Sequence, residues 1–315
     1  MVMKLSIIIA TRNRAHAIVG CLDSIPPAFA KAGPLDAEIV VVDNGSTDNT
    51  FQIVTQWAAR SPYPVRVLSE RKPGLSRAHN RALLAAQGEF LAFTDDDCRL
   101  TEDYVADLLR HHAADSEPVL RGGRIELGDP ADLPLTIKTT PEPMQWSRRL
   151  NSARHQPITG QINGCNMTMP RVIVEKVGPF DERFGPGGVI SSGGDSDYLF
   201  RTYLAGFTLA YVPDMTVVHH HGRKTAAQGR RLLQGYLIGT GAVFARHTPE
   251  HFNFCRPFLW DCKNAVKEIL AGGSSTTTLD YFSHRDKVVY AVRGALRYIF
   301  IASHKTTRTL WDEEQ

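Results

Sequence analysis

Three consecutive carboxylates, Asp95, Asp96 and Asp97, follow an apolar stretch over residues 90–93. Because like charges at this spacing repel one another, such a cluster needs a positive group to neutralise it. Hard oxygen ligands in this number suit Mg²⁺ or Mn²⁺, and Mg²⁺ usually lies between one or two carboxylates and the phosphates of a substrate. The run therefore predicts a divalent-cation site for a phosphorylated substrate. An acidic surface turn is the alternative interpretation.

A fourth carboxylate, Asp43, follows the apolar run over residues 38–42 in the same way, and the run over 5–10 leads into a polar loop with Thr11 and Arg14. In an open α/β sheet such loops meet at the edge where nucleotides bind, and a carboxylate there commonly bonds a base or a ribose. The chain has neither a G-x-G-x-x-G nor a G-x-x-x-x-G-K-S/T motif, so the nucleotide must be held in another way. A simple turn before the following Asn-Gly pair is the alternative role for Asp43.

Alternating strand and helix patterns position these loops in the N-terminal half. The strand runs are short and apolar, and the helical runs carry apolar residues every three to four positions. Such alternation favours a parallel sheet with helices on both faces. The predicted strands cover 5–10, 38–42, 65–68 and 90–93, and the predicted helices cover 15–30 (interrupted at Pro26 and Pro27), 49–59, 75–86 and 102–112.

The pattern is less regular in the second half. Residues 129–143 contain four prolines and no periodicity, and a loop of this length inside a domain is usually functional or mobile. Residues 185–194 contain five glycines, which predicts a flexible segment able to close over a ligand. Further predicted strands cover 121–127, 163–169 and 209–212, and further helices cover 172–177, 195–205, 226–245, 258–271 and 285–303.

Composition is that of an ordinary globular protein, with 43% hydrophobic and 22% charged residues among 315. Five scattered cysteines without a C-x-x-C pair indicate neither a zinc site nor a disulfide framework and favour a reducing cytoplasm. We expect no signal peptide and no transmembrane helix, because no apolar stretch approaches about 20 residues. The net charge of +3 divides into 22 Lys+Arg against 25 Asp+Glu through His219, and 14 against 8 from His220 onward. The C-terminal third is therefore the basic part.

The chain resembles family 2 glycosyltransferases of the GT-A fold in five ordered motifs, found at Ser6–Arg14, Val41–Asp48, Gly74–Asn80, Gly88–Asp97 and Gly178–Phe184. The resemblance covers roughly two thirds of the chain, and five motifs in order are far more specific than any one alone. It implies a GT-A domain over residues 1–222, with a Rossmann-like, mostly parallel sheet and helices on both faces. A helical C-terminal extension would follow over 223–315. The resemblance also implies a divalent metal, a nucleotide-sugar donor and sugar transfer with inversion at the anomeric carbon.

Carried over residue by residue, the resemblance assigns the first loops to the nucleotide. Thr11 and the loop to Arg14 would line the nucleotide pocket, and Asp43 would contact the base, which we expect to be uracil. Arg77 would lie near the diphosphate, although a solvated helix arginine is the alternative. Asp95 would contact the ribose or share the metal.

The same resemblance assigns the cation, Mg²⁺ or Mn²⁺, to the acidic cluster. Asp96 or Asp97 would bind the ion that bridges the two phosphates, with Asp95 as a further ligand. A histidine after the last predicted strand often completes such sites, and His219 is our first candidate in the run of three histidines. Solvated, neutral histidines are the alternative interpretation of that run.

A second acidic motif, over residues 193–201, would supply the catalytic base. Inverting transfer needs a base near the acceptor hydroxyl, and Asp195 is the candidate. The Glu that usually precedes it in the family is replaced by Gly194, which puts the acceptor contact made by that Glu in doubt. The predicted contacts to the donor or acceptor sugar are Asp197, Asn166 and His221. Capping of the helix N-terminus is the alternative role for Asp195 and for Asp197.

The expected partners follow from this assignment. They are a nucleotide-sugar donor, most simply a UDP-sugar, and a glycan, lipid-linked or other hydroxyl acceptor, in the synthesis of a cell-surface polysaccharide or glycoconjugate. No nucleic-acid partner is expected. Three roles remain open for the basic C-terminal helices: a solvated helix face, binding of an anionic acceptor, or peripheral contact with the inner face of the cell membrane. The competing functions are a nucleotidyltransferase that makes nucleotide sugars and a non-catalytic nucleotide-sugar binding protein.

Overall fold

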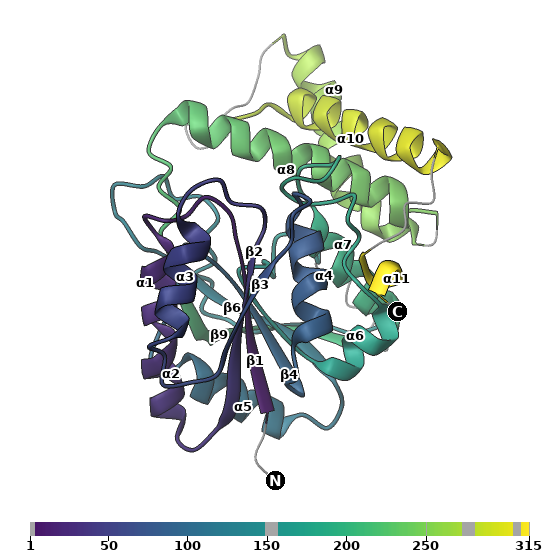
Figure 1. Cartoon of the computed structure of the whole chain (residues 1–315). Coiled ribbons are helices and arrows are strands. Elements are labelled where there is room, and N and C mark those ends of the chain that lie inside the picture. Colours follow the sequence, from purple (N-terminus) through teal and green to yellow (C-terminus); the bar gives the residue numbers. More distant parts are fainter. Residues whose placement is uncertain (1–3, 149–156, 250, 273–280, 305–309, 315) are drawn as a thin grey trace.

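A nine-stranded mixed sheet forms the centre of the molecule (Figure 1). The computed structural model describes residues 4–148, 157–249, 251–272, 281–304 and 310–314. The strand order is β3-β2-β1-β4-β8-β6-β9-β5, and β7 pairs with β9 beside this path. The strands are β1 (Lys4–Thr11), β2 (Asp36–Asp43), β3 (Val65–Ser69), β4 (Phe90–Asp95), β5 (Cys98–Leu100), β6 (Val119–Leu127), β7 (Met144–Trp146), β8 (Asn166–Pro170) and β9 (Thr208–His219).

Helices cover both faces of the sheet, and a helical group lies above the carboxyl end of its parallel strands (Figure 1). This arrangement confirms the predicted fold class, including the C-terminal helical region. The helices are α1 (Ile18–Asp23), α2 (Ile25–Ala32), α3 (Thr50–Ala58), α4 (Leu75–Ala85), α5 (Tyr104–Ala114), α6 (Arg171–Val177), α7 (Gly194–Leu204), α8 (Ala226–His247), the short 3₁₀ helix η2 (Phe252–Cys255), α9 (Arg256–Leu270), α10 (His284–His304) and α11 (Leu310–Glu314).

Parallel pairing of β3, β2, β1 and β4 brings the carboxyl ends of these strands to one edge. The register places Thr11 beside Asp43 and Ala10 beside Asp95. β2 and β4 are buried on both faces, which is why their sequences are apolar runs and not alternating ones. The three loops that carry the predicted nucleotide and metal residues therefore converge, as the sequence indicates.

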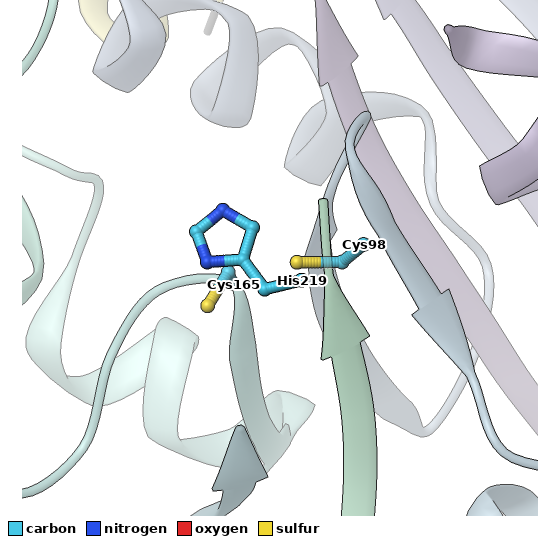
Figure 2. A group of neighbouring side chains, drawn as sticks. All are labelled: Cys98, Cys165 and His219. Atoms are coloured by element: carbon cyan, nitrogen blue, oxygen red, sulfur yellow. The ribbon is translucent and has the colours of Figure 1, made fainter. Parts of the chain in front are cut away.

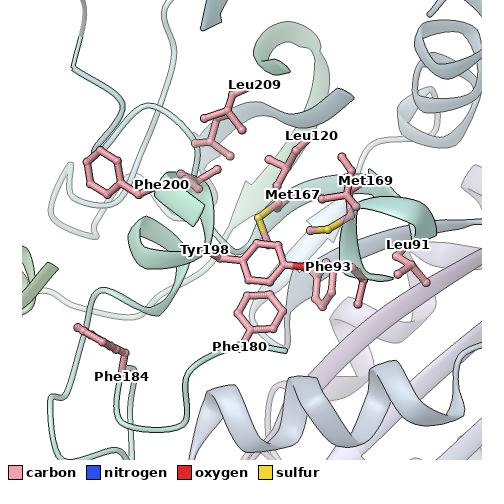
Figure 3. Packing of buried hydrophobic residues seen from close by; sticks show 14 of the residues in the cluster. Leu91, Phe93, Leu120, Met167, Met169, Phe180, Phe184, Tyr198, Phe200 and Leu209 are labelled. Carbon is pink, nitrogen blue, oxygen red and sulfur yellow. The ribbon is translucent and has the colours of Figure 1, made fainter. Parts of the chain in front are cut away.

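Two apolar cores lie on opposite faces of the sheet. Ile7 and Ile9 of β1 point into the core beneath α1, α2, α3 and α5, whereas Ile8 points into the core beneath α4, α6 and α7. In the second core the ring of Phe180 stacks on that of Tyr198, with 4.2 Å between centroids (Figure 3). This packing fixes α7 against β4 and β8, and so fixes the position of the acidic motif at the start of α7.

The antiparallel part of the sheet differs in detail from the sequence prediction. β9 continues to His219, although Pro213 and Asp214 suggest that it ends at Val212. A register shift opposite Gly123 and Arg124 of β6 absorbs the interruption. The strands β5 and β7 were not predicted, because three residues are too few to show a pattern.

The glycine-rich segment 185–194, for which the sequence predicts flexibility, packs closely against the start of α4. A side chain on Gly187 would lie 2.8 Å from the backbone nitrogen of Gly74, and the nitrogen of Leu75 donates to the carbonyl of Pro186 at 2.8 Å. Gly187 also has a φ of 85°, which favours glycine. These contacts hold the segment against the start of α4. A glycine-rich composition is compatible both with such close packing and with flexibility, so composition alone does not distinguish the two.

The C-terminal helices pack through small residues. A β-carbon on Gly241 of α8 would lie 1.9 Å from the carbonyl oxygen of Ala291 of α10, and one on Gly294 of α10 would lie 1.9 Å from that of Ile238. The two helix backbones are therefore in direct contact, which only glycine allows at these points. Among the described helices, none combines the length and the hydropathy that crossing a bilayer requires.

Candidate active site

The acidic cluster lies at the turn between β4 and β5 and is held by two cationic groups. Arg14 reaches it from the loop after β1, with its Nε 3.1 Å from Asp96 Oδ1 and its Nη2 3.1 Å from Asp97 Oδ2. His219 comes from the end of β9, with its Nε2 3.2 Å from Asp97 Oδ1. Three separate strand ends thus meet at Asp97.

Burial and mutual repulsion act on these carboxyls, as the sequence predicts. Burial first, and then the neighbouring charge of Asp97, raise the pKa of Asp95 to about 7. Burial also opposes the charged form of Asp97, but the hydrogen bond and charge of His219 and the charge of Arg14 outweigh it and lower the pKa of Asp97. Asp97 is therefore the permanent anion of the cluster, and Asp95 needs a further positive charge to ionise fully.

Three side chains here fit a divalent cation. Ligand atoms of Asp95, Asp97 and His219 all lie within 4.8 Å of one another. Two carboxylates and an imidazole are a donor set that suits Mn²⁺ or Mg²⁺. The positive charge of such a cation would lower the pKa of Asp95. Asp96, also predicted as a ligand, lies outside this group and pairs with Arg14.

His219 belongs to a second group that the sequence did not indicate. Its ring lies beside the thiols of Cys98 and Cys165, and the ligand atoms of the three residues lie within 4.8 Å of one another (Figure 2). Cys98 is the direct cross-strand neighbour of His219, whereas Cys165 comes from the segment before β8. The two cysteines lie 67 positions apart in the sequence, so no motif of closely spaced ligands indicates this proximity.

Thr136 is a further residue that sequence reasoning missed. Its hydroxyl lies 3.2 Å from Nδ1 of His219, on the side of the ring opposite Asp97. Its backbone has a φ of 54°, which is uncommon for a β-branched residue and marks a constrained position. The only signal in the sequence is the long irregular loop 129–143, which predicts a functional segment but not the residue within it.

Asp43 has one oxygen unused. Its Oδ2 accepts a hydrogen bond from the backbone nitrogen of Ser46 at 3.2 Å, whereas its Oδ1 is buried without a partner among the described residues. A buried, unpaired acceptor is costly, so such an atom is a candidate for a ligand contact. The neighbouring Asn44 joins the loops after β2 and β3, because its side chain bonds the carbonyl of Glu70 at 3.1 Å and the nitrogen of Gly74 at 2.7 Å.

Asp195 begins α7 on the other side of the site. Its Oδ2 accepts from the nitrogen of Gly164 at 3.3 Å and its Oδ1 from the nitrogen of Ser196 at 2.7 Å. Burial raises the pKa of Asp195, and its charge contributes in turn to the raised pKa of Asp95. No ion pair to Asp195 occurs within the described part of the chain. The two carboxylates therefore share one electrostatic neighbourhood, and neither of them forms an ion pair among the described residues.

The model of the family described as "Glycosyl transferase family 2" matches residues 6–177, which is more than half of the chain. The chain belongs to glycosyl transferase family 2. Glycosyltransferase AglE from Haloferax volcanii is similar to it, with 25% identity over 245 residues that cover 76% of this chain and 72% of AglE. This family 2 glycosyltransferase therefore contains the matched domain together with about 140 further residues.

Two solved structures share its fold. Mannosyltransferase PcManGT from Pyrobaculum calidifontis, in complex with GDP-Man and Mn²⁺, has a TM-score of 0.55 and 19% identity, over 98% of this chain and 77% of that one. Residues 1–349 of TarS from Staphylococcus aureus, in complex with UDP-GlcNAc, have a TM-score of 0.53 and 17% identity, over 97% of this chain and 93% of that one. At these identities the likeness establishes the fold alone.

Asp197 does not join the site of this glycosyltransferase. It is fully buried, with Arg201 Nε 2.9 Å from its Oδ2 and both His247 Nε2 (2.9 Å) and Arg246 Nη1 (3.0 Å) at its Oδ1. Burial disfavours its charge, but these partners outweigh burial and hold the pKa of Asp197 well below its usual value. Both oxygens are already engaged, so the prediction of a sugar contact finds no support here, and the contacts point to a structural role that joins α7 to α8.

Three other predicted site residues are also engaged elsewhere. Asn166 donates to the carbonyls of Arg124 and Met215 and accepts from the hydroxyl of Tyr104, which uses both ends of its amide. His221 Nε2 lies 3.0 Å from the carbonyl of Leu133, and its Nδ1 accepts from the nitrogen of Arg223. Arg77 forms an ion pair with Glu182. Asn166 and His221 hold strands and loops in place, and none of the three contacts the acidic cluster.

Asp197→Ala is expected to destabilise the enzyme by about 3–5 kcal/mol, because it leaves buried cationic groups without a counter-charge. The free energy of unfolding, measured with urea, tests this. Since the folded pKa of Asp197 is depressed, its contribution is present at neutral pH and is lost as the pH falls below about 4. The control Asp36→Ala, at an exposed position, should change stability by less than about 0.5 kcal/mol. Equal stability of both variants would contradict the structural role.

Proposed function

We propose that this enzyme transfers a sugar from a nucleoside-diphosphate sugar, most simply a UDP-sugar, to an acceptor hydroxyl with inversion at the anomeric carbon and with the help of a divalent cation. One observation carries the proposal. A half-buried carboxylate with a raised pKa, Asp195, lies near a group of two carboxylates and an imidazole that fits the cation. A base and a leaving-group site side by side are what such a transfer needs.

The nucleotide end of the proposal rests on Asp43. Its unpaired Oδ1 lies at the strand edge where open α/β sheets bind nucleotides, and it can accept a hydrogen bond from a base N–H. Thr11 at the end of β1 and Arg14 in the loop that follows would line the same pocket. The complexes of PcManGT with GDP-Man and of TarS with UDP-GlcNAc support a nucleotide-sugar donor for a chain of this fold.

The chemistry proposed is a single displacement. The acceptor oxygen forms a bond to the anomeric carbon while the bond from that carbon to the donor phosphate oxygen breaks, and Asp195 takes the hydroxyl proton. The nucleoside diphosphate leaves with the electron pair of the broken bond. A bound divalent cation would stabilise the negative charge on the diphosphate. Burial raises the pKa of Asp195, which makes its carboxylate a stronger base than an exposed aspartate.

Residues 1–222 are proposed as the nucleotide-sugar-binding and catalytic unit, and residues 223–315 as a helical extension. The division falls between the end of β9 at His219 and the start of α8 at Ala226. The extension is not isolated from the site region, because Arg246 and His247 of α8 bind Asp197 in α7.

A calorimetric panel of nucleotide sugars tests the donor assignment. We expect UDP-sugars to bind in the presence of Mn²⁺ and to lose most of their affinity with chelator. Asp43→Asn should lower the affinity for uridine nucleotides about 10–100-fold, since a hydrogen bond to a charged acceptor contributes about 1.5–3 kcal/mol. The exposed Asp36→Asn is the matched control. Equal affinity with and without metal for every donor would contradict the metal part of the proposal, and an unaffected Asp43→Asn would contradict the base contact.

A further inference from the structure

Large apolar side chains are exposed on the two outermost helices, α9 and α10. Trp260 is 59% exposed, Ile269 62% and Leu270 82% in α9, and Leu296 is 62% exposed and Ile299 56% in α10. Both helices lie beyond α8, at the end of the molecule remote from the N-terminus (Figure 1). An apolar surface of this extent is unusual in a protein that leaves it in contact with water, so it indicates a binding surface.

The exposed apolar residues of α10 form a single stripe. Val289, Val292, Leu296 and Ile299 recur every three to four positions, which places them along one side of the helix. Ala291 and Gly294, which contact the backbone of α8, lie on the opposite side. The stripe therefore points away from the rest of the enzyme.

The charge exposed on these helices has one sign. Within residues 256–270 and 284–301, every exposed charged side chain is basic, including Lys263, Lys267, Arg285, Arg293 and Arg297. The acidic residues are partly buried and bonded inward. Asp261 lies 2.7 Å from His284 Nδ1, Glu268 accepts from the backbone nitrogens at the start of α10, and Asp286 accepts from Ser283.

We propose that this α9–α10 face, defined by the apolar residues named above and the basic residues beside them, docks on an anionic lipid bilayer. An amphipathic helix with an apolar side and flanking Lys and Arg residues lies in the plane of a bilayer interface and is attracted to acidic headgroups. Arg293 and Arg297 flank the stripe within one helical turn of Leu296. The proposal depends on this surface alone and not on the reaction at Asp195.

Charge favours a bilayer over a second copy of the chain as the occupant. Two copies that met through this face would bring their exposed Lys and Arg residues together with no exposed acid from either face to offset them. Like charges at an interface are unfavourable. An anionic surface offsets those charges while the apolar stripe enters the boundary between headgroups and acyl chains.

Co-sedimentation of the full chain with vesicles tests the proposal. We expect strong binding to phosphatidylcholine vesicles that contain phosphatidylglycerol, weak binding to pure phosphatidylcholine, and loss of binding at high salt. The double variants Val292→Ser/Leu296→Ser and Arg293→Gln/Arg297→Gln should each bind the anionic vesicles at least about tenfold more weakly.

The matched control is Phe51→Ser/Val172→Ser, which removes two apolar side chains, each 44% exposed, from α3 and α6. It should bind vesicles like the unchanged chain. Circular dichroism and nucleotide binding verify that each variant is folded. Equal binding to neutral and anionic vesicles, or full binding by either test variant, would overturn the proposal. So would the absence of vesicle binding together with a dimer, seen by sedimentation velocity, that Val292→Ser/Leu296→Ser dissociates.

Discussion

Replacing Asp195 with asparagine is expected to slow sugar transfer by about 10²–10⁴-fold while donor affinity stays unchanged, because a positioned general base contributes a factor of this size. Asparagine keeps the size of the side chain, and its single carbonyl oxygen can still accept the 2.7 Å hydrogen bond from the nitrogen of Ser196. Only the longer 3.3 Å contact with the nitrogen of Gly164 is lost, so α7 should begin as before. The loss should therefore appear in kcat and not in the dissociation constant of the nucleotide sugar.

The pH dependence of the rate gives a second readout for Asp195. The base acts in its deprotonated form, and burial raises its pKa, so the acid limb of the kcat profile should lie at higher pH than an ordinary aspartate would give. Asp195→Asn should remove this limb, whereas Asp36→Asn at the opposite sheet edge should leave rate and profile unchanged. A variant that transfers sugar at nearly the original rate would mean that another group is the base.

Asp97→Asn is expected to weaken Mn²⁺ binding by at least about 100-fold. Losing a group that only hydrogen-bonds a metal ligand costs up to about 100-fold in affinity, and Asp97 would be a ligand itself. Asp97 is the anion whose pKa stays low and which shares the ligand group with Asp95 and His219. Its loss also leaves Arg14 and His219 without their common partner, so the remaining ligands would be less well held.

Titration of Mn²⁺ by calorimetry, with and without nucleoside diphosphate, measures this effect. Asp96→Asn is the matched control, because Asp96 is adjacent in sequence and also bonds Arg14, but lies outside the ligand group. It should lose much less metal affinity than Asp97→Asn. If the two variants lose the same affinity, the assignment of ligands within the acidic run is wrong.

Most of the parallel half of the fold is predictable from the sequence because its buried strands β2 and β4 are continuous apolar runs. The run that ends at Asp95 and the run that ends at Asp43 are both buried strands, and their convergence follows from parallel pairing. The antiparallel half is less predictable. Its strands are short, or interrupted as β9 is at Pro213, and their order depends on contacts between segments far apart in the chain.

A site residue can be predicted from the sequence when its residue type has one plausible role at that position. It cannot be predicted when two roles, such as catalysis and structure, are equally plausible there. Three adjacent aspartates require a cation, and the structure provides Arg14 and His219 beside them. An aspartate at the start of a helix can serve catalysis or structure, and sequence reasoning assigned both Asp195 and Asp197 to the site. Only the contacts of Asp197 with two arginines and a histidine from α7 and α8 distinguish them.

Arg14, Asp97 and His219 meet in one cluster although they lie far apart along the chain. During synthesis from the N-terminus, the loop after β4 is complete long before β9 exists, so the nascent chain has the carboxylates but not the imidazole. A domain that depends on such distant pairings folds late and comparatively slowly. The growing polypeptide therefore cannot assemble the Asp95, Asp97 and His219 group until residue 219 has left the ribosome, and binding of the proposed cation would be coupled to the completion of the sheet.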